Sequence, residues 1–321
     1  MTRKSSSRPA ATGSRDSGAE PSEPPQGSKR QRLDPGLYLV ATPIGNLRDI
    51  TLRALDLLAN ADIVVCEDSR VTRKLLTAHG LARRLVSYHE HNAERVRPRL
   101  IRHLQDGRSV ALVSDAGTPL VSDPGYKLVS AAYEAGLPVS VAPGASAALA
   151  ALCVSGLPSD RFLFAGFLPP KQAARRKALA ELASVPATLV FFESARRLAA
   201  TLGDMTEVLG DRPAALTREL TKRFEEVRRG ALSDLAARIA ADGPPKGEIA
   251  VVVAGCRPQA PVDTETLDER LRAALAGASL RDAVAAVAAA TGLPRRQVYA
   301  RALERARETG GPPPPEDASG E

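Results

Sequence analysis

The stretch SDAGTPLVSDPG at residues 114–125 follows directly on the apolar run SVALV at residues 109–113. A tight turn needs only about two to four residues of the Gly, Pro, Asp, Ser or Thr type. This stretch is far longer, and its apolar filler is Leu120 and Val121. Loops of this length inside compact domains are uncommon and usually functional. We therefore interpret 114–125 as a functional loop at the end of a buried strand, with an ordinary solvated loop as the alternative.

Short apolar runs alternate with longer amphipathic runs on both sides of this loop. The apolar runs predict buried strands at 36–41, 61–67, 84–90, 109–115 and 137–144. The amphipathic runs predict helices at 51–61, 69–80, 94–107 and 125–136, the first capped by Asp49 or Thr51 and the third containing Pro98. This alternation predicts an α/β domain with a mainly parallel sheet covered by helices on both faces.

Polar residues follow each of the five predicted strands, as ATPIGNLRD (41–49), EDSR (67–70), YHEHN (88–92), SDAGTPLVSDPG (114–125) and APGASA (142–147). In parallel sheets, ligands bind beyond the carboxyl ends of the strands. The long loop is therefore predicted to form one wall of a ligand cleft. Asp115 would accept hydrogen bonds from the ligand there, or would only cap a turn. Ser146 is predicted to cap the next helix, which is compatible with binding because helix N-termini suit carboxylates.

The second half of the chain shows a different pattern of predicted strands and helices. It contains an aromatic-rich run (161–169), a basic helix (171–185), a strand (187–194) followed by a helix from Ala195, another predicted helix (213–232) and the apolar run 246–255. Fewer parallel-type units predict a second, mixed α/β domain. After Pro258 the pattern is wholly helical, and residues 279–307 read as helix, turn, helix.

Composition limits the class of protein. The chain has 321 residues and a net charge of +7. Its three cysteines are widely separated, which argues against a disulfide framework and for a reducing compartment. No apolar run reaches the length of a membrane span, and the N-terminal segment lacks the apolar core of a signal peptide, so a cytoplasmic location is predicted. The predicted organisation is a disordered tail (1–34), two α/β domains (35–150 and 151–257), a helical module (263–308) and a second tail (309–321).

Several motifs occur in an order and spacing that resemble the tetrapyrrole methylase family. They are VATPIGNLRDIT (40–51), VCEDSRVTRKLL (65–76), SDAGTPLVSDPG, VAPGASA (141–147), FFESARRL (191–198), TRELTKRFEEVRRG (217–230) and KGEIAVVVAG (246–255). Within that family, the set is similar to enzymes that methylate the ribose 2′-oxygen of a cytidine in the decoding region of 16S rRNA. One departure is Ser69, where the family usually has Thr; both side chains carry a hydroxyl.

The resemblance implies two α/β domains that bind S-adenosylmethionine in the cleft between them, and a homodimer. No G-x-G-x-x-G loop follows the first strand, which fits a fold other than the Rossmann methyltransferase fold. The resemblance also implies that backbone groups hold most of the methyl donor. Loops rich in small residues and proline suit this, because they let the main chain approach a ligand closely. Position by position, the resemblance implies donor contacts at Pro43, Ile44, Ser114, Asp115, Ala116, Thr118, Ser146, Ala147, Phe192, Leu220, Glu248 and Ile249.

Three residues are candidates for assisting the reaction of a ribose hydroxyl, which is a poor nucleophile at neutral pH. Glu67, Asp68 and Lys222 lie at predicted strand ends or in the TRELTKRFEE motif. Lys222 could act as a base only if burial or neighbouring cations lowered its pKa. Glu67 and Asp68 could equally be salt-bridge partners of Arg70 or Arg73. His89 and His91 are expected on one face of a strand with no third ligand nearby, so no metal site is predicted.

Basic stretches outside the first domain predict contacts with 16S rRNA or the small ribosomal subunit, although a solvated basic face is the default interpretation. The candidate RNA-binding residues are Arg175, Arg176, Lys222, Arg295, Arg296 and Arg301. The helical module is also a candidate dimer contact. Two rival functions remain open, a tetrapyrrole C-methyltransferase on the same fold and a non-enzymatic RNA-binding protein.

Overall fold

The computed structural model describes residues 32–121, 125–256, 264–291 and 293–308. Apart from residues 32–34, the two predicted tails lie outside these ranges, as does the part of the long loop at 122–124. Contacts between residues divide the chain into two units. The first is Met1–Thr42 with Leu47–Gly144, and the second is Pro43–Asn46 with Ala145–Glu321.

The first unit contains a five-stranded sheet in the order β3-β2-β4-β1-β5, and every neighbouring pair is parallel. Its strands are β1 (Gly36–Val40), β2 (Ile63–Cys66), β3 (Leu85–Ser87), β4 (Ser109–Val113) and β5 (Val139–Ala142). All five residues of β4 are buried, as expected for an apolar central strand. The predicted parallel α/β sheet is confirmed.

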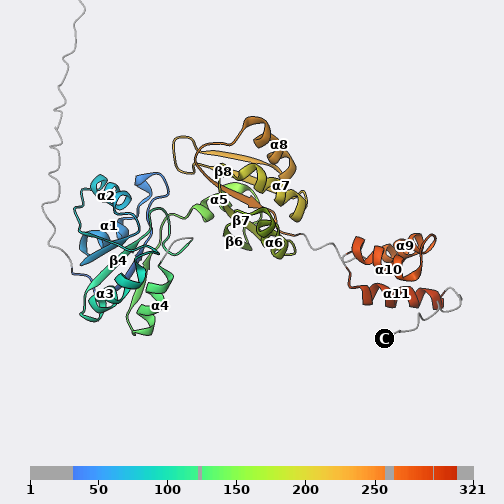
Figure 1. Cartoon of the computed structure of the whole chain (residues 1–321), viewed down its shortest axis with the longest axis horizontal. Coiled ribbons are helices and arrows are strands. Elements are labelled where there is room, and N and C mark those ends of the chain that lie inside the picture. Colours follow the sequence, from blue (N-terminus) through green and yellow to red (C-terminus); the bar gives the residue numbers. More distant parts are fainter. Residues whose placement is uncertain (1–31, 122–124, 257–263, 292, 309–321) are drawn as a thin grey trace, which may run out of the picture. The chain divides into compact units, whose positions relative to one another are not determined.

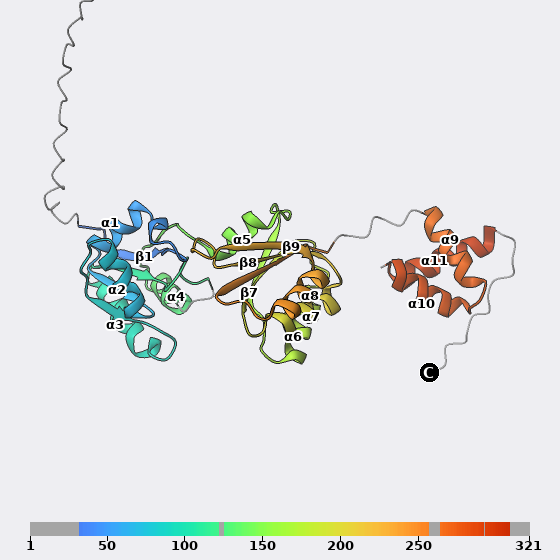
Figure 2. The same cartoon turned by 90° about the horizontal axis from the view of Figure 1, so that it is seen from above.

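Helices cover both faces of this sheet (Figures 1 and 2). They are α1 (Leu52–Asn60), α2 (Ser69–Ala78), α3 (Ala93–Gln105) and α4 (Tyr126–Glu134), with the 3-10 turn η1 at Leu47–Asp49. Alternate side chains of β4 serve the two faces. Ala111 and Val113 pack in one core with residues of α1 and α2, and Val110 and Leu112 pack in the other core with residues of α3 and α4. The connections that lead from β1 to β2 and on to β3 therefore run over one face, and those that lead from β3 to β4 and on to β5 run over the opposite face.

Local sequence explains where these helices begin. Of the two predicted caps for α1, Thr51 is the one used, because its side chain accepts a hydrogen bond from the Ala54 amide. Pro98 lies inside α3. The expected placement of His89 and His91 on a strand is wrong, since β3 ends at Ser87 and both histidines lie in the turn before α3.

The second unit contains a mixed five-stranded sheet in the order β6-β7-β10-β8-β9. Its strands are β6 (Phe162–Phe167), β7 (Thr188–Ser194), β8 (Pro213–Arg218), β9 (Glu226–Ala231) and β10 (Glu248–Val253). The pair β6–β7 is parallel and the other pairs are antiparallel, which confirms the predicted mixed sheet. The helix predicted at 213–232 is wrong, because these residues form the β8–β9 hairpin. Glu219 and Thr221 at its turn have φ values of 50° and 66°, which no right-handed helix accommodates.

The helices of this sheet are α5 (Ala147–Ser155), α6 (Gln172–Leu182), α7 (Leu198–Leu209) and α8 (Leu232–Asp242). Residues of α6, α7 and α8 share one core with Phe191 and Val251, whereas α5 shares another with Val190 and Val252. Because these strand residues alternate, α5 covers the opposite face of the sheet from the other three helices. The helix predicted from Ala195 begins at Leu198.

The helices after the second sheet are α9 (Thr264–Leu275), α10 (Leu280–Thr291) and α11 (Arg295–Glu308). They share a small core that includes Leu267, Leu271, Val287 and Val298. The predicted helix–turn–helix corresponds to α10 and α11, and α9 precedes it. Within the described ranges, no helix is long and apolar enough to cross a membrane.

Candidate functional site

The loop after β4 occupies the position where connections of the first sheet diverge. Strands β1 and β2 lead to α1 and α2 on one face, whereas β4 leads to α4 on the other face. In the sheet, β4 lies between β2 and β1. Such switch points leave a crevice at the carboxyl ends of the strands, where α/β sheets bind ligands. The structure therefore places Ser114, Asp115, Ala116 and Thr118 at this edge.

This loop is fastened to the end of β1 by backbone and hydroxyl hydrogen bonds. Thr42 and Gly117 exchange amide–carbonyl bonds of 2.9 and 3.0 Å. The Thr42 hydroxyl donates to the Ser114 carbonyl at 3.1 Å, and the Ser114 hydroxyl donates to the Gly117 carbonyl at 3.0 Å. Leu120 adopts a φ of 73°, which is rare for a residue other than glycine. Residues 114–117 of the loop are thus fastened to the end of β1, with Asp115 half-buried and Ala116 exposed.

Asp115 also connects this loop to the end of β2. Its Oδ1 atom accepts a hydrogen bond from the Asp68 amide at 2.9 Å. The two residues lie on loops that follow neighbouring strands, so a single carboxylate fixes their separation. Asp115 therefore has a structural role in addition to the predicted one in ligand binding.

If this edge binds S-adenosylmethionine, as the motif resemblance implies, Asp115→Ala should weaken that binding about tenfold or more, because one charged hydrogen-bond acceptor is removed and the Asp68 amide loses its partner. The free energy of unfolding should fall by about 1–3 kcal/mol for the same reason. Isothermal titration with S-adenosylmethionine and urea unfolding measure the two effects. Asp106→Ala, at the far end of α3, is the matched control. Unchanged donor affinity in a folded Asp115→Ala protein would remove Asp115 from the binding site.

The two acidic residues after β2 differ in their surroundings. Asp68 caps α2 and forms a 2.6 Å ion pair with Arg70. The side-chain hydrogen bond from Arg70 is the main cause that lowers the pKa of Asp68 to about 2. Glu67 is half-buried, and burial, together with the charge of Asp115, raises its pKa above the ordinary value. Asp68 is therefore the salt-bridge partner considered above, while Glu67 is the better proton acceptor.

His89 belongs to the same edge, although it was not among the site residues predicted from the sequence. It follows β3, and its charged form interacts electrostatically with Glu67. Its Nδ1 atom is buried and has no hydrogen-bond partner in the described part of the chain. Buried polar atoms are normally hydrogen-bonded, so this nitrogen is an exception at the same edge of the sheet as Glu67. The available sequence indication was that His89 belongs to YHEHN, the polar stretch at the end of the third predicted strand.

In the second unit, Lys222 of the β8–β9 turn lies between two carboxylates, Glu219 of the same turn and Glu248 at the start of β10. The Lys222 ammonium donates to Glu219 and Glu248 at 2.9 Å each. Burial would lower the pKa of Lys222, but these two carboxylates outweigh it and raise the pKa. The condition for Lys222 to act as a base is therefore not met, and Lys222 is a cation at neutral pH.

Residues 43–46 pack against this turn. The Asn46 amide donates to the Thr221 hydroxyl at 3.2 Å. A Cβ at Gly45 would lie 2.5 Å from Lys222 Cγ, so only glycine fits there. The structure therefore brings the segment of the predicted donor contacts Pro43 and Ile44 to the turn that carries Leu220 and Lys222.

Four of the remaining predicted donor contacts, Ser146, Ala147, Phe192 and Leu220, lie at the start of α5 or pack against its core. The Ser146 side chain caps α5 by accepting a bond from the Leu149 amide at 3.5 Å, and Ala147 is the first residue of this helix. Phe192 and Leu220 pack against the core that contains α5. The Ile249 side chain instead belongs to the core of α6, α7 and α8, on the opposite face.

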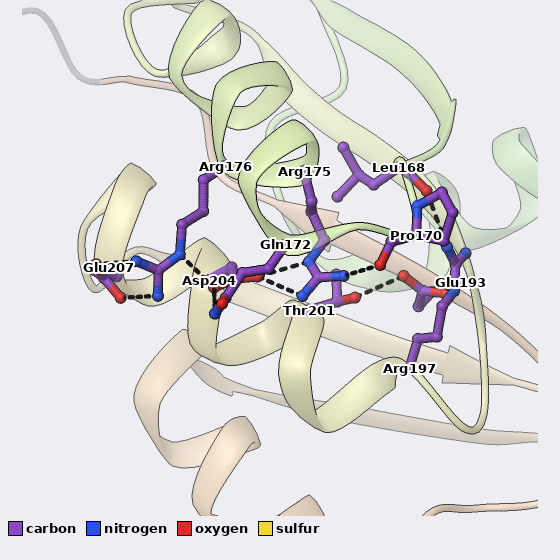
Figure 3. Close-up of polar contacts among 10 residues, drawn as sticks. All are labelled: Leu168, Pro170, Gln172, Arg175, Arg176, Glu193, Arg197, Thr201, Asp204 and Glu207. Atoms are coloured by element: carbon purple, nitrogen blue, oxygen red, sulfur yellow. Dashed lines mark hydrogen bonds and ion pairs between the residues drawn. The ribbon is translucent and has the colours of Figure 1, made fainter.

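Three of the predicted RNA-binding arginines form internal ion pairs, and Figure 3 shows those of Arg175 and Arg176. Arg175 is only 4% exposed and lies 2.6 Å from Asp204. Arg176 pairs with Asp204 and Glu207, and Arg301 pairs with Asp268 at 2.7 Å. The exposed candidates on α11 are Arg295 and Arg296. Within the described residues, no group of three or more His, Cys, Asp or Glu side chains is placed to hold a metal ion.

Comparison with known proteins defines the class first. The profile of the Tetrapyrrole (Corrin/Porphyrin) Methylases matches residues 36–236, which include the first sheet and strands β6 to β9 of the second. The chain therefore belongs to the tetrapyrrole methylase family and is a methyltransferase. The RsmI C-terminal HTH domain profile matches residues 260–306, which include α9, α10 and much of α11.

The relatives narrow the class further. The chain is 56% identical over 275 residues to Ribosomal RNA small subunit methyltransferase I of Mesorhizobium japonicum, covering 85% of this chain and 92% of the relative. It is 50% identical over 279 residues to the protein of the same name from Micromonospora olivasterospora, covering 86% and 88%. Within its family, the chain thus resembles ribosomal RNA small subunit methyltransferases.

Solved structures agree on the fold. Cobalt precorrin-4 methyltransferase superposes with a TM-score of 0.52 at 19% identity, covering 68% of this chain and 94% of that structure. Diphthine synthase gives a TM-score of 0.53 at 19% identity, covering 68% and 89%. These likenesses concern the fold alone.

Proposed function

We propose that this protein transfers a methyl group from S-adenosylmethionine to the ribose 2′-oxygen of a cytidine in the decoding region of 16S rRNA. The observation that carries the proposal is the 56% identity, across 85% of the chain, to a protein named Ribosomal RNA small subunit methyltransferase I. The match of residues 260–306 to the RsmI C-terminal HTH domain supports it further. The cytidine and the 2′-oxygen come from the motif resemblance and form the specific part of the proposal.

The proposed donor contacts fall into two sets. In the first unit they are Ser114, Asp115, Ala116 and Thr118, on the loop that the hydrogen bonds to Thr42 hold in shape. In the second unit, Ile249 would contact the donor through its backbone, because its side chain packs in the core. This second set consists of Pro43, Ile44, Ser146, Ala147, Phe192, Leu220, Glu248 and Ile249.

The chemistry requires alignment and removal of one proton. A sulfonium is already an activated methyl donor, so orienting the ribose oxygen toward the methyl carbon supplies most of the acceleration. We propose Glu67 as the acceptor of the hydroxyl proton, because its half-buried carboxylate has a raised pKa. Asp68 orients α2 through its cap, and Lys222 holds the β8–β9 turn through Glu219 and Glu248.

Several further properties belong to the proposal. The substrate would be 16S rRNA or the small ribosomal subunit, which places the protein in the cytoplasm, and the working form would be a homodimer. The exposed Arg295 and Arg296 are proposed to contact phosphates. Arg175, Arg176 and Arg301 are proposed to stabilise the fold instead, because each is paired with a carboxylate.

A transfer assay tests this function. Purified protein is incubated with donor labelled in its methyl group and with small ribosomal subunits from a strain that lacks the protein. We expect label in the rRNA at one methyl per subunit, and none in a uroporphyrinogen sample. Label in the tetrapyrrole and not in the subunits would favour the C-methyltransferase alternative. Absence of donor binding by calorimetry would favour the non-enzymatic alternative.

Neutralising the two exposed arginines should weaken RNA binding. In Arg295→Gln/Arg296→Gln, the slope of log K against log salt should fall by about 0.7–0.9 for each phosphate that an arginine no longer neutralises. Donor affinity should not change, because neither side chain belongs to the proposed donor contacts. Filter binding of small subunits over a range of KCl concentrations measures the slope. Arg272→Gln/Arg281→Gln, two exposed arginines on α9 and α10, is the control. An unchanged slope would leave the module as a dimer contact only.

A further inference from the structure

An exposed aromatic ring lies at the end of the edge strand β6. The Phe167 side chain is 58% exposed, so much of its apolar surface is in contact with water. Covering this surface with a ligand or partner would be favourable. Its ring packs edge-to-face against Phe192, with centroids 5.6 Å apart, and Phe192 packs in the same way against Phe164 at 4.8 Å. One side of Phe167 is therefore supported by a row of rings and the other side is open.

An irregularity in β6 gives Phe167 this position. The register with β7 shifts between Phe164 and Gly166, and Gly166 has a φ of 63°. Phe164 then pairs with Val190 and Phe167 pairs with Phe192, two residues on the same face of β7. In a regular strand, residues three apart point to opposite faces. The bulge therefore turns Phe167 to the face that carries α5, and bulges often re-aim a side chain next to a functional site.

Two buried ion networks hold the segment that follows Phe167 (Figure 3). Arg197 pairs with the buried Glu193 at 2.7 Å and donates to the Leu168 carbonyl at 3.1 Å. Arg175 pairs with the buried Asp204 at 2.6 Å and donates to the Pro170 carbonyl at 3.1 Å. Two carbonyls shortly after the exposed ring are thus fixed by guanidinium groups anchored in the core.

Exposed cations flank the same segment. Lys171 follows Pro170, and Arg196 precedes the Arg197 that holds Leu168. Both side chains are exposed, and neither makes an ion pair or side-chain hydrogen bond within the described residues. The hydrogen bond from Arg197 to the Leu168 carbonyl joins the segment of Arg196 to that of Phe167, and Lys171 follows shortly after in the chain. Exposed rings and cations on neighbouring segments are the combination by which proteins bind single-stranded RNA, with a base on the ring and phosphates on the cations.

We propose that Phe167, Lys171 and Arg196 form a subsite for a single-stranded segment of rRNA, in which one base stacks on the Phe167 ring. The inference rests on the proposed function and names residues that bind its substrate. The occupant is RNA rather than the adenine of the donor, since Phe192 is the predicted donor contact and Phe167 is the more exposed ring. Arg197 and Arg175 position the subsite through their hydrogen bonds to the Leu168 and Pro170 carbonyls.

The test compares four variants of the full chain, with unmethylated small subunits as the probe. Phe167→Leu removes the ring and Phe167→Trp restores a stacking surface. Phe162→Leu, at the other end of β6 and 42% exposed, is the matched control. Lys171→Gln/Arg196→Gln removes the cations. Binding is measured by filter retention at fixed Mg²⁺ and varied KCl, and donor affinity by calorimetry.

Phe167→Leu should weaken subunit binding about tenfold with an unchanged salt slope, because stacking releases no counterions. Phe167→Trp and Phe162→Leu should bind within twofold of the wild type. The double cation variant should flatten the slope by about 0.7 for each phosphate that it no longer neutralises. All four should bind the donor normally and keep the melting temperature and oligomeric state of the wild type.

Three results would overturn the subsite. They are wild-type subunit affinity in Phe167→Leu, a loss confined to donor affinity, or a change of oligomeric state, which would make Phe167 a contact between copies of the chain. If the wild-type protein methylates subunits and Phe167→Leu binds and methylates them equally well, only this inference is wrong. Wild-type protein that neither binds nor methylates subunits defeats the proposed function and the subsite with it.

Discussion

Glu67→Gln should lower kcat for methylation of small subunits by about 100- to 10,000-fold, the range typical for loss of a positioned general base. The substitution keeps the size and hydrogen-bonding capacity of the side chain while removing its ability to take up a proton. Donor affinity and the melting temperature should stay close to those of the wild type. The loss should therefore also appear in the rate constant for methyl transfer that single-turnover experiments with saturating donor measure.

The pH dependence provides a second readout that a structural role would not change. The pKa of Glu67 is raised by burial and by the charge of Asp115. A base must be deprotonated to act, so wild-type kcat should fall as the pH is lowered through this raised pKa, above the ordinary value of 4.5. In Glu67→Gln that limb should disappear. Glu90→Gln, an exposed residue of the turn after β3, is the control. A Glu67→Gln enzyme within twofold of wild-type kcat would exclude Glu67 as the proton acceptor.

Asp204→Asn should lower the free energy of unfolding of the second unit by about 3–5 kcal/mol. Asp204 is 2% exposed and accepts hydrogen bonds from Gln172, Arg175 and Arg176 at 3.1, 2.6 and 2.7 Å. Without its charge, the buried Arg175 guanidinium has no countercharge. Glu207→Gln removes the exposed partner of Arg176 and should cost about 0–1 kcal/mol. Urea unfolding followed by circular dichroism measures both.

Acid should have a similar effect on the wild type. Burial alone would raise the pKa of Asp204, but hydrogen bonds from Arg176, Gln172 and Arg175 outweigh it and lower the pKa below 3.8. A lowered pKa stabilises the folded state above the unfolded-state value, and this stabilisation disappears as the pH falls through the folded-state value. Stability should therefore decline below about pH 4, and Asp204→Asn should show a smaller decline. A cost under about 1 kcal/mol for Asp204→Asn would show that the network contributes little.

Parts of the fold were predictable because they depend on local periodicity. The apolar run at 109–113 and the polar loop after it identify β4 and the ligand edge of the first sheet without any tertiary information. The β8–β9 hairpin was missed because the charges of residues 217–229 repeat at a helical spacing. A helix cannot run through this stretch because Glu219 and Thr221 have positive φ values, and the turn packs closely against Gly45 and Gly247, which are distant in the sequence.

The candidate site shows the same division. Asp115 was identified from its place after a strand, and the structure adds its bond to the Asp68 amide, which joins residues far apart in the sequence. Arg175 and Arg176 resembled a basic surface because a sequence shows charges without their partners. Asp204 lies on the next helix, and only the packing of α6 against α7 makes the pair. Burial likewise separates Glu67 from Asp68, which are neighbours of the same charge type.

The central claim is methylation of a ribose 2′-oxygen in small-subunit rRNA, and mass mapping of that rRNA tests it most directly. 16S rRNA from a deletion strain, before and after treatment with the purified protein and S-adenosylmethionine, is digested and its methylated nucleosides are located. We expect a 2′-O-methylcytidine in the decoding region that is absent in the deletion strain and restored by the wild-type protein, but not by Glu67→Gln. An identical methylation pattern in all samples, or a new methyl group on a base, would contradict the claim.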